Sequence, residues 1–433
     1  MKHLHPAKIL VLGYLLYSII GCLILSLPIC HTGSIKLLDT YFTAISAVST
    51  TGLATIDIGT QYNMFGQMVI LLLVQLGGVG YMTFSSFILL CTSQKLSAYR
   101  KKIGASSFAF PKDFSIQEFI SSVIIFSFLC EFLGAIALSL VFWQKGIEHW
   151  IWNGLFHSIS AFCTAGLSLF SDGFISFQTD VACNLILAVL ALLGSMGFIV
   201  SLDFYKKWTE ENHTLSFTTQ VILTASGLFL TIGTCLFFGL ETITDRTSLV
   251  REAMIGFFQV MSAMTTTGFN SVDIGKLTPS ILILLAFLST FGSAPSGTGG
   301  GLKNTAFASL VAFVKSTLKG QPITLWRHLI PLGRIKIATV AFIYYVFSLS
   351  FALFLLSLSE QHQPSLDIFY EAANALNNSG LSTGLTEKLT PIGKILIALL
   401  MLMGRVGVLT FGVAISSQKE ESSVLHKKTE LIT

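Results

Sequence analysis

Four short segments, each centred on one glycine, combine residue types and spacing that suggest a common binding site. They are 46–53 (SAVSTTGL), 160–167 (SAFCTAGL), 262–269 (SAMTTTGF) and 374–381 (NALNNSGL). Their glycines are separated by 114, 102 and 112 residues, so the chain is four copies of one unit. Glycine permits left-handed backbone angles, and rings of backbone carbonyls can replace the hydration shell of a monovalent cation. The repeated segments therefore predict a site for a dehydrated cation.

The residues that end each segment are the predicted walls of this site. A carboxylate follows the glycine at short distance as Asp57, Asp172 and Asp273, with Glu387 a looser counterpart in the fourth unit. One such segment alone is more often an ordinary loop or a small-residue helix contact. Four at near-equal spacing favour a shared ion-selectivity filter, which would be lined by Ser49, Thr50, Thr51, Gly52, Cys163, Thr164, Ala165, Gly166, Thr265, Thr266, Thr267, Gly268, Asn377, Asn378, Ser379 and Gly380.

Composition indicates that membrane helices position these segments. Apolar residues are 52% of the 433 and charged residues only 11%, with a mean hydropathy of +0.75. A soluble surface is usually about a quarter charged, and a disordered chain carries far fewer apolar residues, so both classes are excluded. About 20 residues cross a bilayer as a helix. Apolar runs of at least that length lie near 9–30, 64–91, 117–143, 181–205, 217–240, 279–313 (interrupted), 337–358 and 392–416.

Each unit is predicted to be a span, a short re-entrant helix, the glycine-centred loop and a second span. Non-helical backbone inside a membrane is tolerated only where it is buried in protein or lines a water-filled cavity. We therefore expect an all-α polytopic membrane protein, with eight transmembrane helices and four pore helices around one pseudo-fourfold pore. The C-terminal ends of the pore helices would direct negative partial charge at its axis. The expected units are 1–91, 92–205, 206–313 and 314–416, followed by a tail at 417–433.

The distribution of basic residues predicts the orientation. The N-terminus, 92–116, 206–216, 314–336 and the tail hold 17 of the 26 Lys and Arg residues. Because cytoplasmic loops are enriched in Lys and Arg, we expect both termini in the cytoplasm. The seven cysteines include no C-x-x-C pair, and no basic stripe suggests nucleic-acid binding.

The four segments also resemble those of a known family. The S-A-x-x-T-x-G pattern is similar to that of the Trk/Ktr/HKT superfamily of potassium and sodium transporters, whose subunit has four span–pore loop–span units. Further similar stretches are 75–84 (QLGGVGYMTF), 381–386 (LSTGLT) and 404–410 (GRVGVLT). The resemblance covers nearly the whole chain. Because the first unit starts almost at residue 1, the chain looks closest to the Ktr-type membrane subunit.

A glycine-rich stretch, 291–304 (FGSAPSGTGGGLKN), interrupts the sixth apolar run. Glycine and proline inside a helix are energetically unfavourable. The stretch contains neither the nucleotide-binding P-loop motif G-x-x-x-x-G-K-[ST] nor the serine-hydrolase motif G-x-S-x-G. A plain loop between two short helices is one interpretation. The resemblance implies instead an intramembrane gate, formed by Gly292, Ser293, Ser296, Gly297, Thr298, Gly299, Gly300, Gly301, Lys303 and Arg405.

Arg405 and Lys303 are the charged members of this predicted gate. A lone arginine deep in a helix costs ~2.5–3.5 kcal/mol on insertion scales, so Arg405 should find acceptors. It is either a structural or snorkelling side chain or, as the resemblance implies, the residue that holds the gate, by bonding to 292–301. Lys303, at the end of the loop, is expected to reach cytoplasmic water.

The resemblance implies a transported ion and partners. Glycine at the four filter positions accompanies potassium transport in this superfamily, so potassium is the expected substrate. Asn374, Asn377 and Asn378 depart from the pattern, and their amides are candidates to narrow or hydrate the site. Sodium or non-selective cation transport is therefore the alternative. The chain itself should need no cofactor. Nucleotide is expected only on a separate cytoplasmic regulatory subunit (a KtrA-like ring), beneath a homodimer in the bacterial inner (plasma) membrane.

Two other classes of protein remain as rivals. A secondary transporter of another substrate would show broken helices in paired positions of two halves, whereas here the motif recurs four times. A membrane enzyme would need clustered intramembrane His, Asp or Glu residues. Glu131 is the clear intramembrane acid and is expected to bond within the bundle, and His157 stands alone beside the second loop. We therefore do not expect an enzyme.

Overall fold

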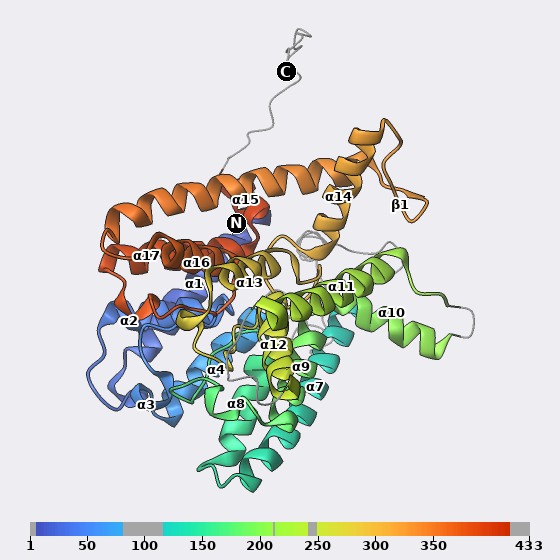
Figure 1. Cartoon of the computed structure of the whole chain (residues 1–433). Coiled ribbons are helices and arrows are strands. Elements are labelled where there is room, and N and C mark those ends of the chain that lie inside the picture. Colours follow the sequence, from blue (N-terminus) through green and yellow to red (C-terminus); the bar gives the residue numbers. More distant parts are fainter. Residues whose placement is uncertain (1–5, 81–115, 211–212, 241–248, 416–433) are drawn as a thin grey trace.

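The computed structural model describes residues 6–80, 116–210, 213–240 and 249–415. It is a body of helices (Figure 1), and the two strands among the described residues form one small hairpin, β1 (Thr324–Leu325) with β2 (His328–Leu329). The predicted helical class is therefore confirmed. Short 3-10 turns connect the helices: η1 (Pro28–Cys30), η2 (Ile175–Phe177), η3 (Ile274–Lys276) and η4 (Thr386–Lys388).

Four of the described helices are long and apolar enough to cross a bilayer singly. They are α1 (Pro6–Leu25), α7 (Ile116–Gln144), α11 (Phe217–Leu240) and α15 (Leu332–Ser359). Large apolar side chains such as Leu16 and Phe347 are mostly exposed on them. Exposed apolar surface on this scale is unusual for a soluble monomer but suits contact with lipid. Each of these helices lies in a different one of the predicted units.

A short helix follows each of the long ones and ends at a glycine-centred segment. These are α2 (Leu37–Val48), α8 (Trp150–Phe162), α12 (Leu249–Met264) and α16 (Ser365–Asn377). Each packs against the long helix before it and against the helix after it. A fifth short helix, α3 (Ile58–Gln61), follows the first segment. The same three-helix contact thus recurs four times along the chain.

The helices after the segments differ from the expected continuous spans. The runs at 181–205 and 392–416 are each broken, into α9 (Val181–Ser195) with α10 (Phe198–Thr209), and α17 (Pro391–Val406) with α18 (Val408–Ile415). The two pairs are bent by 93° and 101°. The breaks fall at Gly197 and Gly407, whose φ angles of +89° and +91° an α-helix cannot contain. The apolar runs did not indicate these bends, because hydropathy does not register a glycine at a bend.

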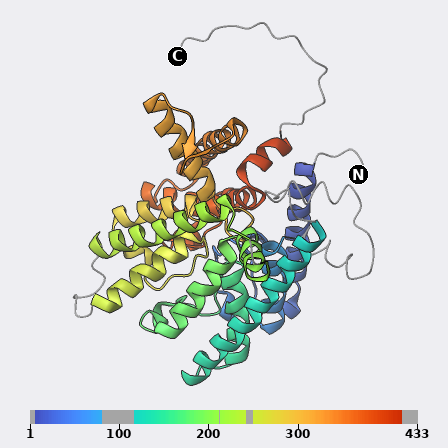
Figure 2. The same cartoon turned by 90° about the vertical axis from the view of Figure 1, so that its right-hand side faces the viewer.

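Of the other two apolar runs, the third unit's agrees with the sequence, whereas in the first unit α4 ends at Gly78 and Gly80 has a φ angle of +87°. The third unit has α13 (Pro279–Phe291) and α14 (Asn304–Lys319), separated by the predicted glycine-rich interruption. In the first unit α4 (Met64–Gly78) is described, but the rest of the 64–91 run and residues 81–84 of the 75–84 motif lie outside the described residues. Seen from the side, α14 and the hairpin project beyond the helical body (Figure 2).

One glycine per unit lets the second helix lie against the end of the short helix. A Cβ atom added at that glycine would overlap a backbone carbonyl oxygen in the last turn of the short helix. The pairs are Gly77 with Val48, Gly194 with Phe162, Gly292 with Met264, and Gly404 with Leu376. Small residues at such contacts allow helix backbones to approach closely in membranes. These glycines therefore position the four helix ends.

We predict that Gly77→Ala destabilises the protein by about 1–3 kcal/mol, because its methyl group must displace the carbonyl of Val48. Thermal unfolding in detergent should show a lower midpoint. Gly227→Ala is the matched control: it also lies within a helix, but no atom is within 4 Å of the added Cβ. Equal midpoints for the two variants would contradict the proposed role of the close contact.

Candidate functional site

Each short helix ends in the same hydrogen-bonded turn. In the first unit the Thr50 N–H donates to Ala47 O (3.1 Å) and the Thr51 N–H to Ser46 O (2.9 Å). This Schellman arrangement requires a left-handed residue just beyond the helix. The same pair of bonds recurs in the other three units. The left-handed positions are Thr50, Thr164, Thr266 and Asn378, with φ between 50° and 58°.

The four glycines that follow these turns meet in a closed ring. A Cβ atom added at any of them would contact the backbone of the next unit, and the last unit closes onto the first. The contacts are Gly52 with Ala165, Gly166 with Thr267, Gly268 with Gly380, and Gly380 with Thr51. The structure therefore brings together segments that are more than 100 residues apart in the sequence. A side chain at any of these glycines would require the ring to open.

Serine side chains that precede the predicted lining residues also tie the loops in place. Ser46 Oγ accepts the Gly52 N–H (3.1 Å), while Ser160 and Ser262 donate to the carbonyls of Leu167 (2.8 Å) and Phe269 (2.6 Å). The set of candidate site residues did not include these serines. Their recurrence in the S-A-x-x-T-x-G pattern was the signal that could have identified them.

Two asparagines of the fourth loop bond to neighbouring elements. Asn377 accepts a hydrogen bond from the Tyr345 hydroxyl (2.9 Å) and donates to Ser289 (2.9 Å) and Thr290 (3.0 Å). Its amide is thus held among α13 and α15 and is not free to narrow or hydrate the site. Asn378 Nδ2 donates to Thr51 Oγ1 (2.9 Å) and Met401 O (2.7 Å). Asparagine also adopts the left-handed conformation more readily than threonine does.

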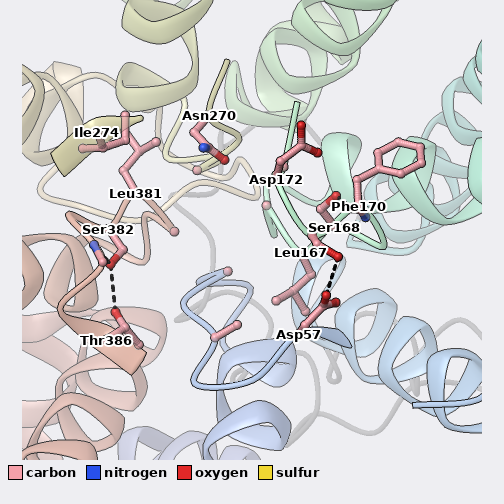
Figure 3. A pocket seen from close by; sticks show the side chains of 18 of the residues that line it. Asp57, Leu167, Ser168, Phe170, Asp172, Asn270, Ile274, Leu381, Ser382 and Thr386 are labelled. Carbon is pink, nitrogen blue, oxygen red and sulfur yellow. Dashed lines mark hydrogen bonds between the residues drawn. The ribbon is translucent and has the colours of Figure 1, made fainter. Parts of the chain in front are cut away.

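Above the ring lies an acidic cavity. Its volume is about 310 Å³, and the four ring glycines are among the residues that line it. Figure 3 shows the loops of all four units around this hollow. The described residues that line it include no Lys or Arg. They include all four carboxylates that the sequence singled out: Asp57, Asp172, Asp273 and Glu387. Negative charge around a low-dielectric opening concentrates cations there.

Three of these carboxylates also have a local structural role. Asp172 Oδ2 accepts the Ser176 N–H (3.0 Å). Asp57 caps α3 by accepting the N–H groups of Gly59 (2.8 Å) and Thr60 (3.3 Å). Asp273 accepts the Gly275 N–H (3.1 Å) and pairs with the exposed Lys276 (3.0 Å). Helix caps commonly use aspartate for this purpose. The carboxylates therefore shape the mouth of the cavity as well as contributing charge to it.

The glycine-rich interruption packs against three of the loops that form the ring. Thr298 accepts a bond from Thr164 Oγ1 (3.1 Å) and donates to Phe162 O (3.1 Å), and the Gly300 N–H donates to Thr266 Oγ1 (2.9 Å). A Cβ atom added at Gly300 would overlap the carbonyl oxygen of Asn377. Glycine at this position is therefore required for the close approach.

Other residues of the interruption hold its backbone in a compact form. Ser296 and Gly301 have positive φ angles of 62° and 71°. The Ala294 and Thr298 N–H groups donate to the carbonyls of Ser195 (3.1 Å) and Gly194 (3.0 Å) at the end of α9. Ser293 donates to the Gly300 carbonyl, and Gly297 and Gly299 lie against the carbonyls of Ser195 and Thr265. The segment is an ordered, densely bonded loop.

Arg405 joins this loop to the first unit. Its guanidinium donates to the carbonyl of Thr298 and to those of Gly77 and Gly78 (3.0 Å) at the end of α4. The expected contact with 292–301 is present, and the contact with α4 is new. The last carbonyls of a helix lack intrahelical partners and carry negative partial charge, so a guanidinium suits them.

Lys303 does not reach towards water as expected. Its ammonium turns back onto its own loop, donating to the carbonyls of Gly299 and Gly300 (2.9 Å) and to Ser293 Oγ (3.3 Å). A compact glycine turn leaves carbonyl oxygens without N–H partners, and three ammonium hydrogens can satisfy them. This local demand explains why the prediction for Lys303 was wrong.

The described residues contain no cluster of three or more His, Cys, Asp or Glu side chains placed to hold a metal. Glu131 is buried and accepts hydrogen bonds from Gln75 Nε2 at both carboxylate oxygens (3.1 and 3.0 Å). It is therefore bonded within the bundle, as expected. The six cysteines in the described part of the chain are free thiols.

Comparison with known proteins identifies the family. The model of the TrkH family, described as cation transport proteins, matches residues 15–427. The chain belongs to this family. It is 32% identical to the Ktr system potassium uptake protein B of Bacillus subtilis, over 99% of this chain and 96% of that protein. The protein of the same name from Vibrio alginolyticus is also 32% identical, over 93% and 90% of the two chains.

A further relative and a solved structure agree with this assignment. The chain is 28% identical to the potassium/sodium uptake protein NtpJ of Enterococcus hirae, over 100% of this chain and 98% of that one. The fold matches the crystal structure of the potassium transporter TrkH from Vibrio parahaemolyticus, with a TM-score of 0.72 and 20% identity, over 93% of this chain and 83% of that one. This TrkH-family chain is thus a membrane protein of a transporter family, as the sequence predicted.

Asn378 tests the left-handed turn at the end of the short helices. We predict that Asn378→Ala lowers the free energy of unfolding by about 1–3 kcal/mol, because it loses two buried hydrogen bonds and places alanine at φ 53°. Asn378→Gly loses the same bonds but tolerates the angle, so its thermal midpoint should lie above that of the alanine variant. The reverse order would show that backbone conformation does not limit this position.

Proposed function

We propose that the protein carries potassium ions into the cell through a channel-like pore, downhill with the membrane potential. The observation that carries the proposal is the closed ring of four glycine-centred loops at the base of an acidic cavity. Ions would enter from this cavity and lose their water among the backbone carbonyls of the loops. Those carbonyls belong to the residues predicted from the sequence, from Ser49–Gly52 in the first unit to Asn377–Gly380 in the fourth.

Electrostatics favours a cation at this place. The four short helices all end at the ring, so their C-terminal partial negative charges converge there. The carboxylates of the cavity would raise the local concentration of cations before they are dehydrated. An anion would meet unfavourable potential at both steps.

Potassium is favoured over sodium by two lines of support. Glycine occupies all four ring positions, and two relatives at 32% identity are named potassium uptake proteins. The alternative, sodium or mixed monovalent cation transport by the same fold, is kept open by the relative named as a potassium/sodium uptake protein. Transport of an unrelated substrate has no comparable support.

We further propose eight crossings in four units, with both termini in the cytoplasm of a bacterial inner membrane. Among the described residues, the four long helices and the two bent pairs supply up to six crossings, and the shorter apolar helices α4 and α13 lie in the other two apolar runs. The bias of Lys and Arg supports the orientation. Under this arrangement the units are those expected from the sequence, at 1–91, 92–205, 206–313 and 314–416.

The partners are also a proposal. Resemblance to the Ktr type supports a homodimer above a cytoplasmic ring of nucleotide-binding subunits, with no cofactor in this chain. The projecting α14 and hairpin carry exposed basic residues, including Lys319 and Arg327, on the side that would face such a ring. Their position supports this segment as a contact.

The loop at 292–301 is proposed as the gate. It packs directly against the ring through Thr298 and Gly300, so it would obstruct the path on the side opposite the cavity. Arg405 and Lys303 would hold it there and add positive charge that opposes a cation. Opening requires these bonds to break, which a regulatory partner could drive.

Ion uptake in a bacterial host that lacks its own potassium uptake systems tests the substrate. We expect the protein to restore growth at low potassium and to take up rubidium, which substitutes for potassium in such sites, in preference to sodium. Sodium uptake without rubidium uptake would refute potassium selectivity, and uptake of neither ion would refute cation transport.

Replacement of Arg405 tests the gate. Arg405→Ala should raise rubidium uptake by up to about tenfold, because losing charge-assisted bonds to the loop shifts the equilibrium towards the open state. Arg334→Ala, which removes an exposed arginine, is the matched control and should leave uptake unchanged. Unaltered uptake by Arg405→Ala at equal membrane abundance would reject the gating role.

A further inference from the structure

In three units, a buried polar side chain on the short helix accepts a hydrogen bond from the backbone N–H of the third residue after the ring glycine. His157 Nε2 accepts the Leu169 N–H (3.2 Å), Gln259 Oε1 accepts the Ser271 N–H (3.2 Å), and Glu371 Oε1 accepts the Thr383 N–H (3.1 Å). Donor and acceptor are 12 residues apart in every case. Each acceptor lies nine residues before its ring glycine, and each donor lies three residues after it. All three side chains are at most 1% exposed.

The three side chains share an acceptor atom but not a charge. His157 Nδ1 lies 2.8 Å from the carbonyl oxygen of Asn153 and must donate to it, which leaves Nε2 unprotonated and able to accept. Gln259 is a neutral amide. Glu371 accepts further bonds from the hydroxyls of Ser382 and Thr386 (2.7 Å). Because an imidazole, an amide and a carboxyl group occupy one position, the common requirement is an acceptor for that N–H.

The first unit holds its corresponding residue through a different bond. Its residue at this position is Thr43, whose hydroxyl donates to Asp39 O within its own helix (2.9 Å). Asp39, one turn earlier, accepts the hydroxyl of Thr55 (2.8 Å) and pairs with Lys394 (2.6 Å). Thr55 is again the third residue after the ring glycine. All four short helices therefore hold this residue.

The residue that is held forms part of the contact between units. The Leu169 carbonyl lies against Gly59 of the first unit, and the Thr383 carbonyl lies against Gly275 of the third, so closely that a Cβ atom at either glycine would overlap it. Gly59 and Gly275 each lie seven residues after a ring glycine. Holding the third residue thus fixes both the wall of the cavity and its fit to the neighbouring unit.

We propose that His157, Gln259 and Glu371, together with Asp39 in the first unit, are positioning residues that set the width of the ring and thereby its discrimination among monovalent cations. This inference rests on the proposed function, because it assumes that ions pass the ring. It assigns the role to the acceptor atom and not to the charge of any of these side chains.

Exchanging the acceptors tests the proposal through the KM for rubidium and the ratio of rubidium to sodium uptake. His157→Gln and Glu371→Gln place at these positions the residue that the third unit uses, so both quantities should stay within about twofold of the starting protein. His157→Leu and Glu371→Leu keep similar volume without an acceptor. We expect them to raise the KM about tenfold, the factor that corresponds to one lost buried hydrogen bond, and to lower the ratio.

Ser158→Ala is the matched control on the same short helix as His157. It removes a buried hydrogen bond to the Glu131 carbonyl (2.7 Å). It removes no acceptor for the N–H of the third residue after the ring glycine. It should leave the KM and the uptake ratio unchanged, even if the protein becomes less stable. This separates positioning of the ring from a general loss of stability.

Two results would overturn the inference. One is that the leucine variants, at equal amounts of folded protein in the membrane, keep the KM and the ratio of the starting protein. The other is that the glutamine variants lose selectivity, and this result is decisive even if the leucine variants do not accumulate. Failure of the proposed function looks different, because the unmodified protein would then take up no rubidium.

Discussion

The rest of this structure depends on the contact between a glycine of each second helix and the carbonyl end of the short helix before it. Four helix ends meet around one point, although each carries negative partial charge. Side chains at Gly77, Gly194, Gly292 and Gly404 would hold the helices apart. With glycine there, the second helices support the turns from outside, and the loops come close enough to form a ring.

Backbone N–H and carbonyl groups outside the helices need partners on both sides of the ring. On one side, carboxylates and loop backbone form an open, acidic cavity. On the other, Arg405 and Lys303 bond to carbonyls of the interrupted helix and of α4. The opposed charges follow from one cause: backbone that is not helical inside the protein needs partners. A path for cations and an obstacle to them can therefore be built from the same loops.

The four units share geometry more than chemistry. Threonine occupies the left-handed position in three units and asparagine in the fourth. The acceptor that holds the third residue after the ring glycine is an imidazole, an amide, a carboxyl group or, in the first unit, an aspartate one turn earlier on the helix. The third unit has a proline and serine loop where the second and fourth units bend at a glycine. Repetition fixes where a bond must be made, and each unit then makes it with a different side chain.

The sequence by itself determined the membrane class, the short helix before each glycine and the residue types of the ring, because hydropathy and a repeat spacing are local properties that survive without coordinates. It could not determine the bends at Gly197 and Gly407, since a glycine in an apolar run looks the same whether φ is negative or positive. Nor could it reveal that Arg405 reaches Gly78, 327 residues away, or that Lys303 turns inward. Those outcomes depend on which carbonyls lack partners once the chain is packed, and only the tertiary structure decides that.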